Sequence, residues 1–119
     1  MKIRIKGNSV RFRLDKLDLQ LLEENGRVDE KTEFPSSTFI YSVLSSRNEE
    51  IESDFKSNRI ELRLPETLIQ KWINSDQVGF ENNEGSLKIL IEKDFQCLTP
   101  REEEDDLNTF PNPLEKHTC

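Results

Sequence analysis

The amino-acid sequence predicts an α+β domain: a mostly antiparallel, curved sheet or partly open barrel with two short helices. Three observations indicate this class. Several short segments alternate apolar and polar residues with the period of a strand. Two other segments carry the residues that start and stop helices. The connections are short, which favours antiparallel pairing because a parallel pair needs a crossover of about a dozen residues. The predicted order is ββαββββαββ, with the helices on one face or end of the sheet.

The chain has 119 residues, the length of about one domain. Leu, Ile, Val and Phe make up about 29% of it, above the roughly 20% typical of disordered chains. After Leu98 only Leu107, Phe110 and Leu114 remain of these types. We therefore expect one domain over residues 1–98 and an acidic, proline-containing tail over residues 99–119.

The first two predicted strands form a hairpin. Residues 2–6 and 10–14 alternate strictly around Gly7-Asn8-Ser9, a pattern typical of two strands joined by a tight turn. The alternation places five apolar side chains toward the core: Ile3, Ile5, Val10, Phe12 and Leu14. The basic side chains of the same strands then face the other way.

The first helix follows directly. Asp15 is a suitable N-cap with Asp18 three residues later, and Asn25-Gly26 is a typical C-terminal stop. Leu17, Leu21 and Leu22 are the expected apolar stripe. Residues 28–34 and 38–44 are then two further strands, separated by Pro35-Ser36-Ser37.

The second half has the same kinds of elements. Residues 50–55 and 59–64 are strands, and Pro65 is expected at the first position of a helix. The apolar stripe of that helix is Leu68, Ile69, Trp72 and Ile73. Residues 78–81 and 87–93 form a last hairpin around a turn at 82–85. No internal repeat is visible.

Charge is distributed unevenly. The net charge is -7, yet residues 1–16 contain six cations and one acid. An acidic chain repels nucleic acid and acidic membranes at long range, so neither is an expected partner. The first six residues do not resemble a signal peptide, and no apolar run reaches the length of a membrane span. We expect a cytoplasmic protein.

The basic hairpin is the main candidate site. An anion could bind to Lys2, Arg4, Lys6, Asn8, Ser9, Arg11 and Arg13. Two other interpretations stay open. The cations could pair across strands with carboxylates of the sheet. They could also pair with the tail, in the same chain or in a neighbouring subunit, through Glu102, Glu103, Glu104, Asp105 and Asp106, with Phe110 as an apolar anchor.

Metal binding and catalysis receive little support. Cys97, His117 and Cys119 could ligate zinc or copper, but they lack the paired spacing of established zinc motifs. Residues 1–98 contain no histidine, which removes histidine-based acid–base chemistry from the predicted domain. No dinucleotide, P-loop or nucleophile-elbow motif occurs. We expect no cofactor and, on balance, no enzyme.

Several stretches together resemble a family of small, acidic, uncharacterised bacterial proteins. The resemblance covers nearly the whole chain and is carried by residues 1–9 with Arg11, Arg13 and Leu14, and by 32–35, 75–79, 90–95, Cys97-Leu98 and 110–113. It implies a free-standing bacterial protein whose tail is a regular part of the family's sequence. It implies no catalytic residue.

The sequence therefore predicts a non-enzymatic interaction or structural protein, with a homo-oligomer or an unidentified protein as partner. The alternative is a protein or enzyme that binds a small anion, a phosphate or nucleotide, through the basic hairpin.

Overall fold

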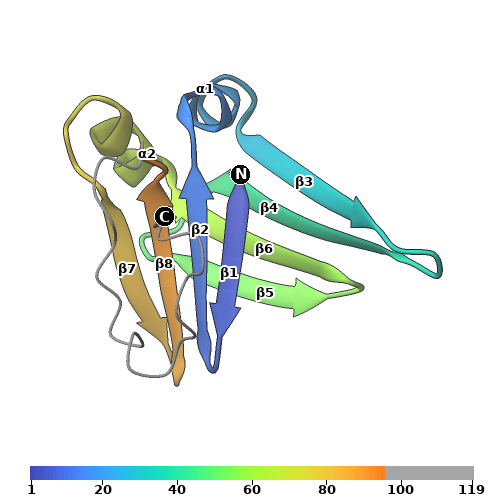
Figure 1. Cartoon of the computed structure of the whole chain (residues 1–119). Coiled ribbons are helices and arrows are strands. Elements are labelled where there is room, and N and C mark those ends of the chain that lie inside the picture. The colour runs from blue at the N-terminus through green and yellow to red at the C-terminus, as the bar shows by residue number, and fades with distance from the viewer. Residues whose placement is uncertain (96–119) are drawn as a thin grey trace, which may run out of the picture.

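The computed structural model describes residues 1–95, which form eight strands and two helices in the predicted order (Figure 1). The strands are β1 (Lys2–Lys6), β2 (Ser9–Leu14), β3 (Arg27–Glu33), β4 (Thr38–Ser46), β5 (Glu52–Lys56), β6 (Arg59–Pro65), β7 (Gly79–Glu84) and β8 (Leu87–Lys93). The helices are α1 (Lys16–Asn25) and α2 (Glu66–Ile73). The predicted α+β class is confirmed.

The strands form two four-stranded sheets and do not close into a barrel. Sheet A has the order β1-β2-β8-β7, and sheet B has the order β3-β4-β6-β5. Each outer pair is an antiparallel hairpin, as the short connections predict. Each central pair, β2–β8 and β4–β6, is parallel. Both sheets are therefore mixed, and each parallel pair joins two strands that do not follow each other in the chain.

The topology contains a two-fold repeat, although no repeat is visible in the sequence. Each half of the chain is a hairpin, a helix and a second hairpin, and each sheet takes one hairpin from each half. The turn between Lys6 and Ser9 matches the turn between Lys56 and Arg59, fifty residues later. Sheets A and B are thus topologically equivalent, and β2 corresponds to β6.

The core lies between the inner faces of the two sheets and beneath the helices. Central strands supply Phe12, Leu14, Val43, Leu62, Leu64, Ile89 and Ile91. Helix α1 adds Leu22, and α2 adds Ile69 and Trp72. Trp72 also donates an Nε1–H hydrogen bond to the carbonyl of Val78 at 3.1 Å and packs edge-on against Phe80.

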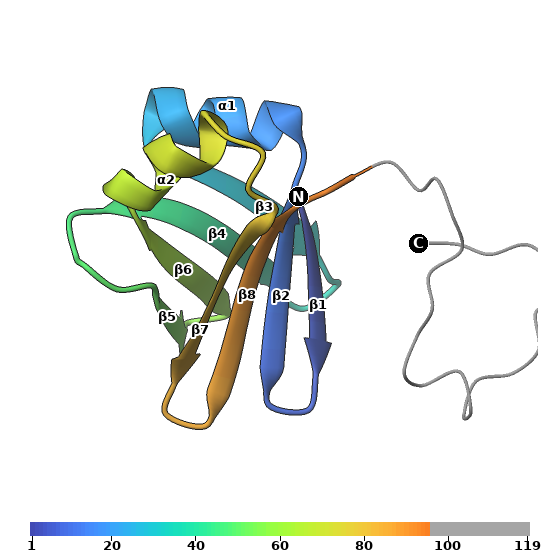
Figure 2. The same cartoon turned by 90° about the vertical axis from the view of Figure 1, so that its left-hand side faces the viewer.

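Both helices lie together at one end of the molecule, and the tips of the β1–β2 and β7–β8 hairpins lie at the opposite end (Figures 1 and 2). The predicted caps of α1 are confirmed: Asp15 and Asp18 form a reciprocal capping box, and Gly26 ends the helix with a φ of 76°. Neither described helix is long and apolar enough to cross a membrane.

Four local predictions are wrong. Leu17 is exposed rather than part of the apolar stripe, which Leu19 and Leu21 complete beside Leu22. Ile5 is exposed because it lies beyond the reach of the helices. Pro65 is the N-cap of α2 rather than its first residue. The last turn is Gly85-Ser86, since β7 continues to Glu84 and lengthens the hairpin.

Candidate anion-binding face

The outer side of sheet A gathers most of the predicted anion-binding residues. Strand alternation and register place Lys2, Arg4 and Lys6 of β1 on the same side as Ser9, Arg11 and Arg13 of β2. Asn8 lies in the connecting turn and donates to Ser86 Oγ at 2.9 Å. That bond links the tips of two hairpins of the sheet.

Strands β8 and β7 complete this surface, which we call the basic face. Lys88 and Glu92 of β8 lie beside Ser9 and Arg13, and Glu81 of β7 lies beside Leu90. The strands of the basic face thus carry six cations (Lys2, Arg4, Lys6, Arg11, Arg13 and Lys88) and two carboxylates (Glu81 and Glu92), and Asp94 just beyond β8 adds a third carboxylate beside Lys2.

Like charges stand directly opposite each other on the basic face. Arg4 pairs in register with Arg11, and Lys2 pairs with Arg13. Directly opposed like charges destabilise a pair of strands. This arrangement therefore costs stability, unless an anion lies over it.

The nearby carboxylates compensate the charge only in part. Glu92 Oε1 lies 3.5 Å from both Arg11 Nε and Arg13 Nε, so one carboxylate serves two guanidinium groups. Lys2 pairs with Asp94 at 3.0 Å, and Lys88 pairs with Glu81 at 3.6 Å. The interpretation as a charge-paired sheet face therefore holds for part of the surface, and a positive excess remains.

Two arginines keep hydrogen-bonding capacity. Within residues 1–95, Arg4 forms no ion pair. The Nε of Arg11 is buried and has no hydrogen-bond partner among the described residues, because Glu92 lies at ion-pair distance only. A buried N–H without a partner costs about 1–3 kcal/mol, so the packing of Arg11 against Glu92 is not optimal.

The equivalent outer side of sheet B, the balanced face, provides a control within the molecule. It has five cations (Arg27, Lys31, Lys56, Arg59 and Arg63) and five carboxylates (Asp29, Glu33, Glu52, Asp54 and Glu61). Arg27 donates two hydrogen bonds to Asp29, which with the nearby Ser42 and Arg59 lower the pKa of that carboxyl despite its partial burial. Arg63 lies 3.8 Å from both Glu52 and Glu61.

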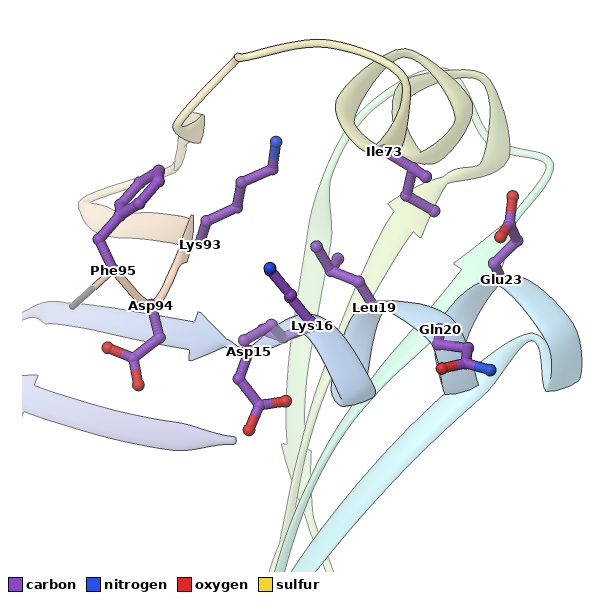
Figure 3. Close-up of a pocket in the computed structure, with 10 residues that line it drawn as sticks. Asp15, Lys16, Leu19, Gln20, Glu23, Ile73, Lys93, Asp94 and Phe95 are labelled. Atoms are coloured by element: carbon purple, nitrogen blue, oxygen red, sulfur yellow. The ribbon is translucent and has the colours of Figure 1, made fainter.

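A pocket of about 420 Å³ lies beside the helices, at the end of β8 (Figure 3). Leu19 and Ile73 come from the two helices, and Asp15, Lys93 and Asp94 add charges at its rim. Lys16 and Glu23 also line it, and the three charges at the rim already have partners: Asp15 caps α1, Lys93 donates to the Ser75 carbonyl at 2.8 Å, and Asp94 binds Lys2. No predicted site residue lines this pocket.

Sequence reasoning missed Lys88 and Glu92. Both belong to the basic face because β8 pairs in parallel with β2. Their alternation with Ile89 and Ile91 indicates the side on which they lie. No local signal indicates which strand is their neighbour.

The remaining predicted site residues lie outside the described part of the chain: Cys97, Glu102, Glu103, Glu104, Asp105, Asp106, Phe110, His117 and Cys119. Within residues 1–95, no three His, Cys, Asp or Glu side chains are grouped to hold a metal ion.

The sequence matches the model of a Family of unknown function (DUF7009) over residues 1–114. This match confirms the resemblance to an uncharacterised family. No curated protein and no solved structure matches the chain.

Proposed function

Because the chain belongs to DUF7009, a family of unknown function, we propose a function from its own surface: it is a non-enzymatic interaction module whose basic face binds an acidic polypeptide segment. One observation carries this proposal. Two topologically equivalent sheet faces differ in charge, with six cations and three carboxylates, Asp94 included, on one and five of each on the other.

An acidic segment fits the layout of the basic face. The cations extend along β1 and β2, and a strand of six residues such as β2 is about 20 Å long. An extended segment has a similar rise per residue, so successive acids can follow the strands. The attraction is electrostatic and partly exposed to solvent, and it should weaken as salt rises.

The chain itself contains a suitable segment, residues 102–106, which lie outside the described residues. Residue 102 follows Phe95 by seven positions, a reach of up to about 24 Å. Phe95 stands just beyond β8, which borders β2 in sheet A. The segment can therefore serve its own basic face or that of a second copy, and the second arrangement gives a homo-oligomer.

The test uses full-length protein in which the acidic run is neutralised (E102Q, E103Q, E104Q, D105N and D106N). Fluorescence anisotropy then measures binding of a labelled peptide of residues 99–110. Adding R4Q and R11Q should weaken binding about tenfold, since each exposed ion pair contributes up to about 1 kcal/mol. The matched pair R59Q and R63Q, on the balanced face, should leave it nearly unchanged.

Equal effects of the two double variants, or no binding at low salt, contradict the proposal. Light scattering of the unmodified chain separates the two arrangements. A dimer at low salt that becomes monomeric when the acidic run is neutralised indicates binding to a second copy. A monomer in both cases indicates binding within one chain.

A small phosphorylated anion is the second candidate ligand. The opposed guanidinium groups of Arg4 and Arg11 favour it, because a phosphate oxygen is a strong acceptor for a guanidinium N–H. A thermal-shift series with inorganic phosphate and nucleoside phosphates tests it. Stabilisation of the neutralised protein that R11Q removes supports this ligand, and the absence of any shift excludes it.

A further inference from the structure

The two sheets leave an apolar cleft at the end of the molecule opposite the helices. Its volume is about 530 Å³, within the range of small-molecule sites. Its apolar lining is Ile5, Val10, Phe39, Phe55, Ile60 and Leu87. These side chains come from both halves of the chain, and Ile5 with Val10 correspond to Phe55 with Ile60 in the two-fold repeat.

The cleft exposes large apolar side chains. Phe55 is 70% exposed and Ile5 is 59% exposed, while equivalent inner-face residues nearer the helices are buried. Isolated exposed apolar residues are common, but several grouped in one concave site are typical of a binding surface.

The walls of the cleft are held by hydrogen bonds between strands of different hairpins. Ser53 of β5 donates from its backbone N–H and its hydroxyl to Glu84 Oε1 of β7, both at 2.9 Å. Asn82 donates to the Ile51 carbonyl at 2.7 Å, a second bond between the sheets along this edge. The cleft is therefore present before any ligand binds.

The charged side chain at the rim of the cleft is that of Glu84. Asp54 also borders the cleft, but its side chain lies on the balanced face, opposite Glu61. Glu84 forms no ion pair with a described cation. Ser53 fixes the orientation of Glu84 without neutralising it. A cationic group placed at this rim gains an uncompensated carboxylate, whereas an anionic group is repelled.

We propose that this cleft binds a small amphiphilic amine, with its apolar part between Phe55, Ile5 and Leu87 and its ammonium group at Glu84. The acidic run at 102–106 does not fit this site, because its charge has the same sign as the rim. The cleft and the basic face meet at Asn8 and Ser9, which line the cleft and belong to the predicted anion-binding set, but their charged groups favour ligands of opposite sign.

The test measures binding of octylamine, 1-octanol and octanoate to the full-length protein by isothermal titration calorimetry. The three probes share an apolar chain and differ in head group. Affinity should fall in the order amine, alcohol, carboxylate. F55A should weaken octylamine binding about fivefold, because it removes apolar contact area. F95A, which truncates a phenylalanine that is 60% exposed outside this cleft, should leave it unchanged.

E84Q isolates the charge, since glutamine retains an oxygen that accepts from Ser53. It should reduce octylamine affinity to that of octanol and leave octanol binding unchanged. Binding of octanoate as tight as octylamine, or equal binding by F55A and the unmodified protein, overturns the proposal. R4Q with R11Q should not affect octylamine, so this proposal and that of the basic face fail independently.

Discussion

At the scale of single residues, the close approach of β7 to β8 depends on Gly79. A Cβ at this position would lie 2.0 Å from the carbonyl oxygen of Ile91 and 2.8 Å from the Cα of Glu92. Both obstacles are backbone atoms, which cannot rotate away as a side-chain end can. The absence of a side chain at this position is therefore a requirement of sheet A.

We expect G79A to lower the free energy of unfolding by at least about 2 kcal/mol, because one strand must move away from the other. N83A, an exposed change on the same strand, should cost less than about 0.5 kcal/mol. Chemical denaturation measures both. Similar values for the two variants would contradict the close packing described for Gly79.

Met1 also has a defined structural role, through its N-terminal amino group. It lies 2.9 Å from Asp18 Oδ2 and 3.5 Å from Glu30 Oε1. Burial alone lowers the pKa of this amine, but the hydrogen bond and charge of Asp18, with Glu30, outweigh it and raise the pKa above its usual 8.0. The contact joins β1 to α1 and to sheet B.

This shift predicts a loss of stability in alkali. A group whose pKa is raised on folding stabilises the fold fully below its unfolded pKa, and the contribution disappears as the pH passes the folded value. The free energy of unfolding should therefore fall above pH 8. D18N should flatten that fall, since the amide accepts a hydrogen bond without the charge. An identical pH profile for D18N and the unmodified protein would exclude the contact.

At the scale of elements, local signals predicted α1 well. The reciprocal bonds between Asp15 and Asp18 occupy two backbone N–H groups at its first turn. The backbone hydrogen bond from Asp18 is also the main reason that the pKa of Asp15 is lowered. Helix α2 has no side-chain cap, and Pro65 begins it instead.

D15A should cost about 1 kcal/mol of stability at neutral pH, the typical value of an N-cap. Because the pKa of Asp15 is lowered on folding, its contribution is present above the unfolded value of 3.8 and is lost as the pH falls. The difference between D15A and the unmodified protein should hence shrink toward pH 3. Thermal unfolding across pH measures this, and a constant difference would contradict it.

Element prediction from sequence succeeded where the determining contacts are local. Alternation predicted β1 and β2, and the capping residues predicted the bounds of α1. The prediction failed where contacts with residues distant in sequence determine the local structure. Asn82 and Asn83 have turn-forming side chains, yet they lie in β7 because β8 provides a full pairing partner. Leu17 has the right spacing for a core stripe, but no packed element covers it.

At the scale of the whole molecule, the parallel pairs β2–β8 and β4–β6 could not be predicted from short connections. Each of these pairs joins a hairpin from the first half of the chain to a hairpin from the second half, so each sheet contains strands from both halves. The basic hairpin was predicted as a candidate site from residues 2–13, and the structure adds Lys88 and Glu92 through one of these pairs.

Because each sheet takes one hairpin from each half of the chain, the outer faces of the two sheets can be compared directly. Sheets A and B share order and pairing, so the difference in their charge does not follow from topology. The balanced face has the mixed pattern of an ordinary solvated sheet surface. The basic face keeps opposed cations such as Arg4 and Arg11, and it is therefore the surface on which a binding function is proposed.

The most direct test of that proposal is a backbone amide chemical-shift map. The unlabelled peptide of residues 99–110 is titrated at low salt into ¹⁵N-labelled protein with the acidic run neutralised. We expect saturable shifts along β1, β2 and β8, with Arg4, Arg11 and Lys88 among the largest, and the loss of these shifts at high salt. Shifts centred on β3 to β6, or no saturable shifts at all, would contradict it.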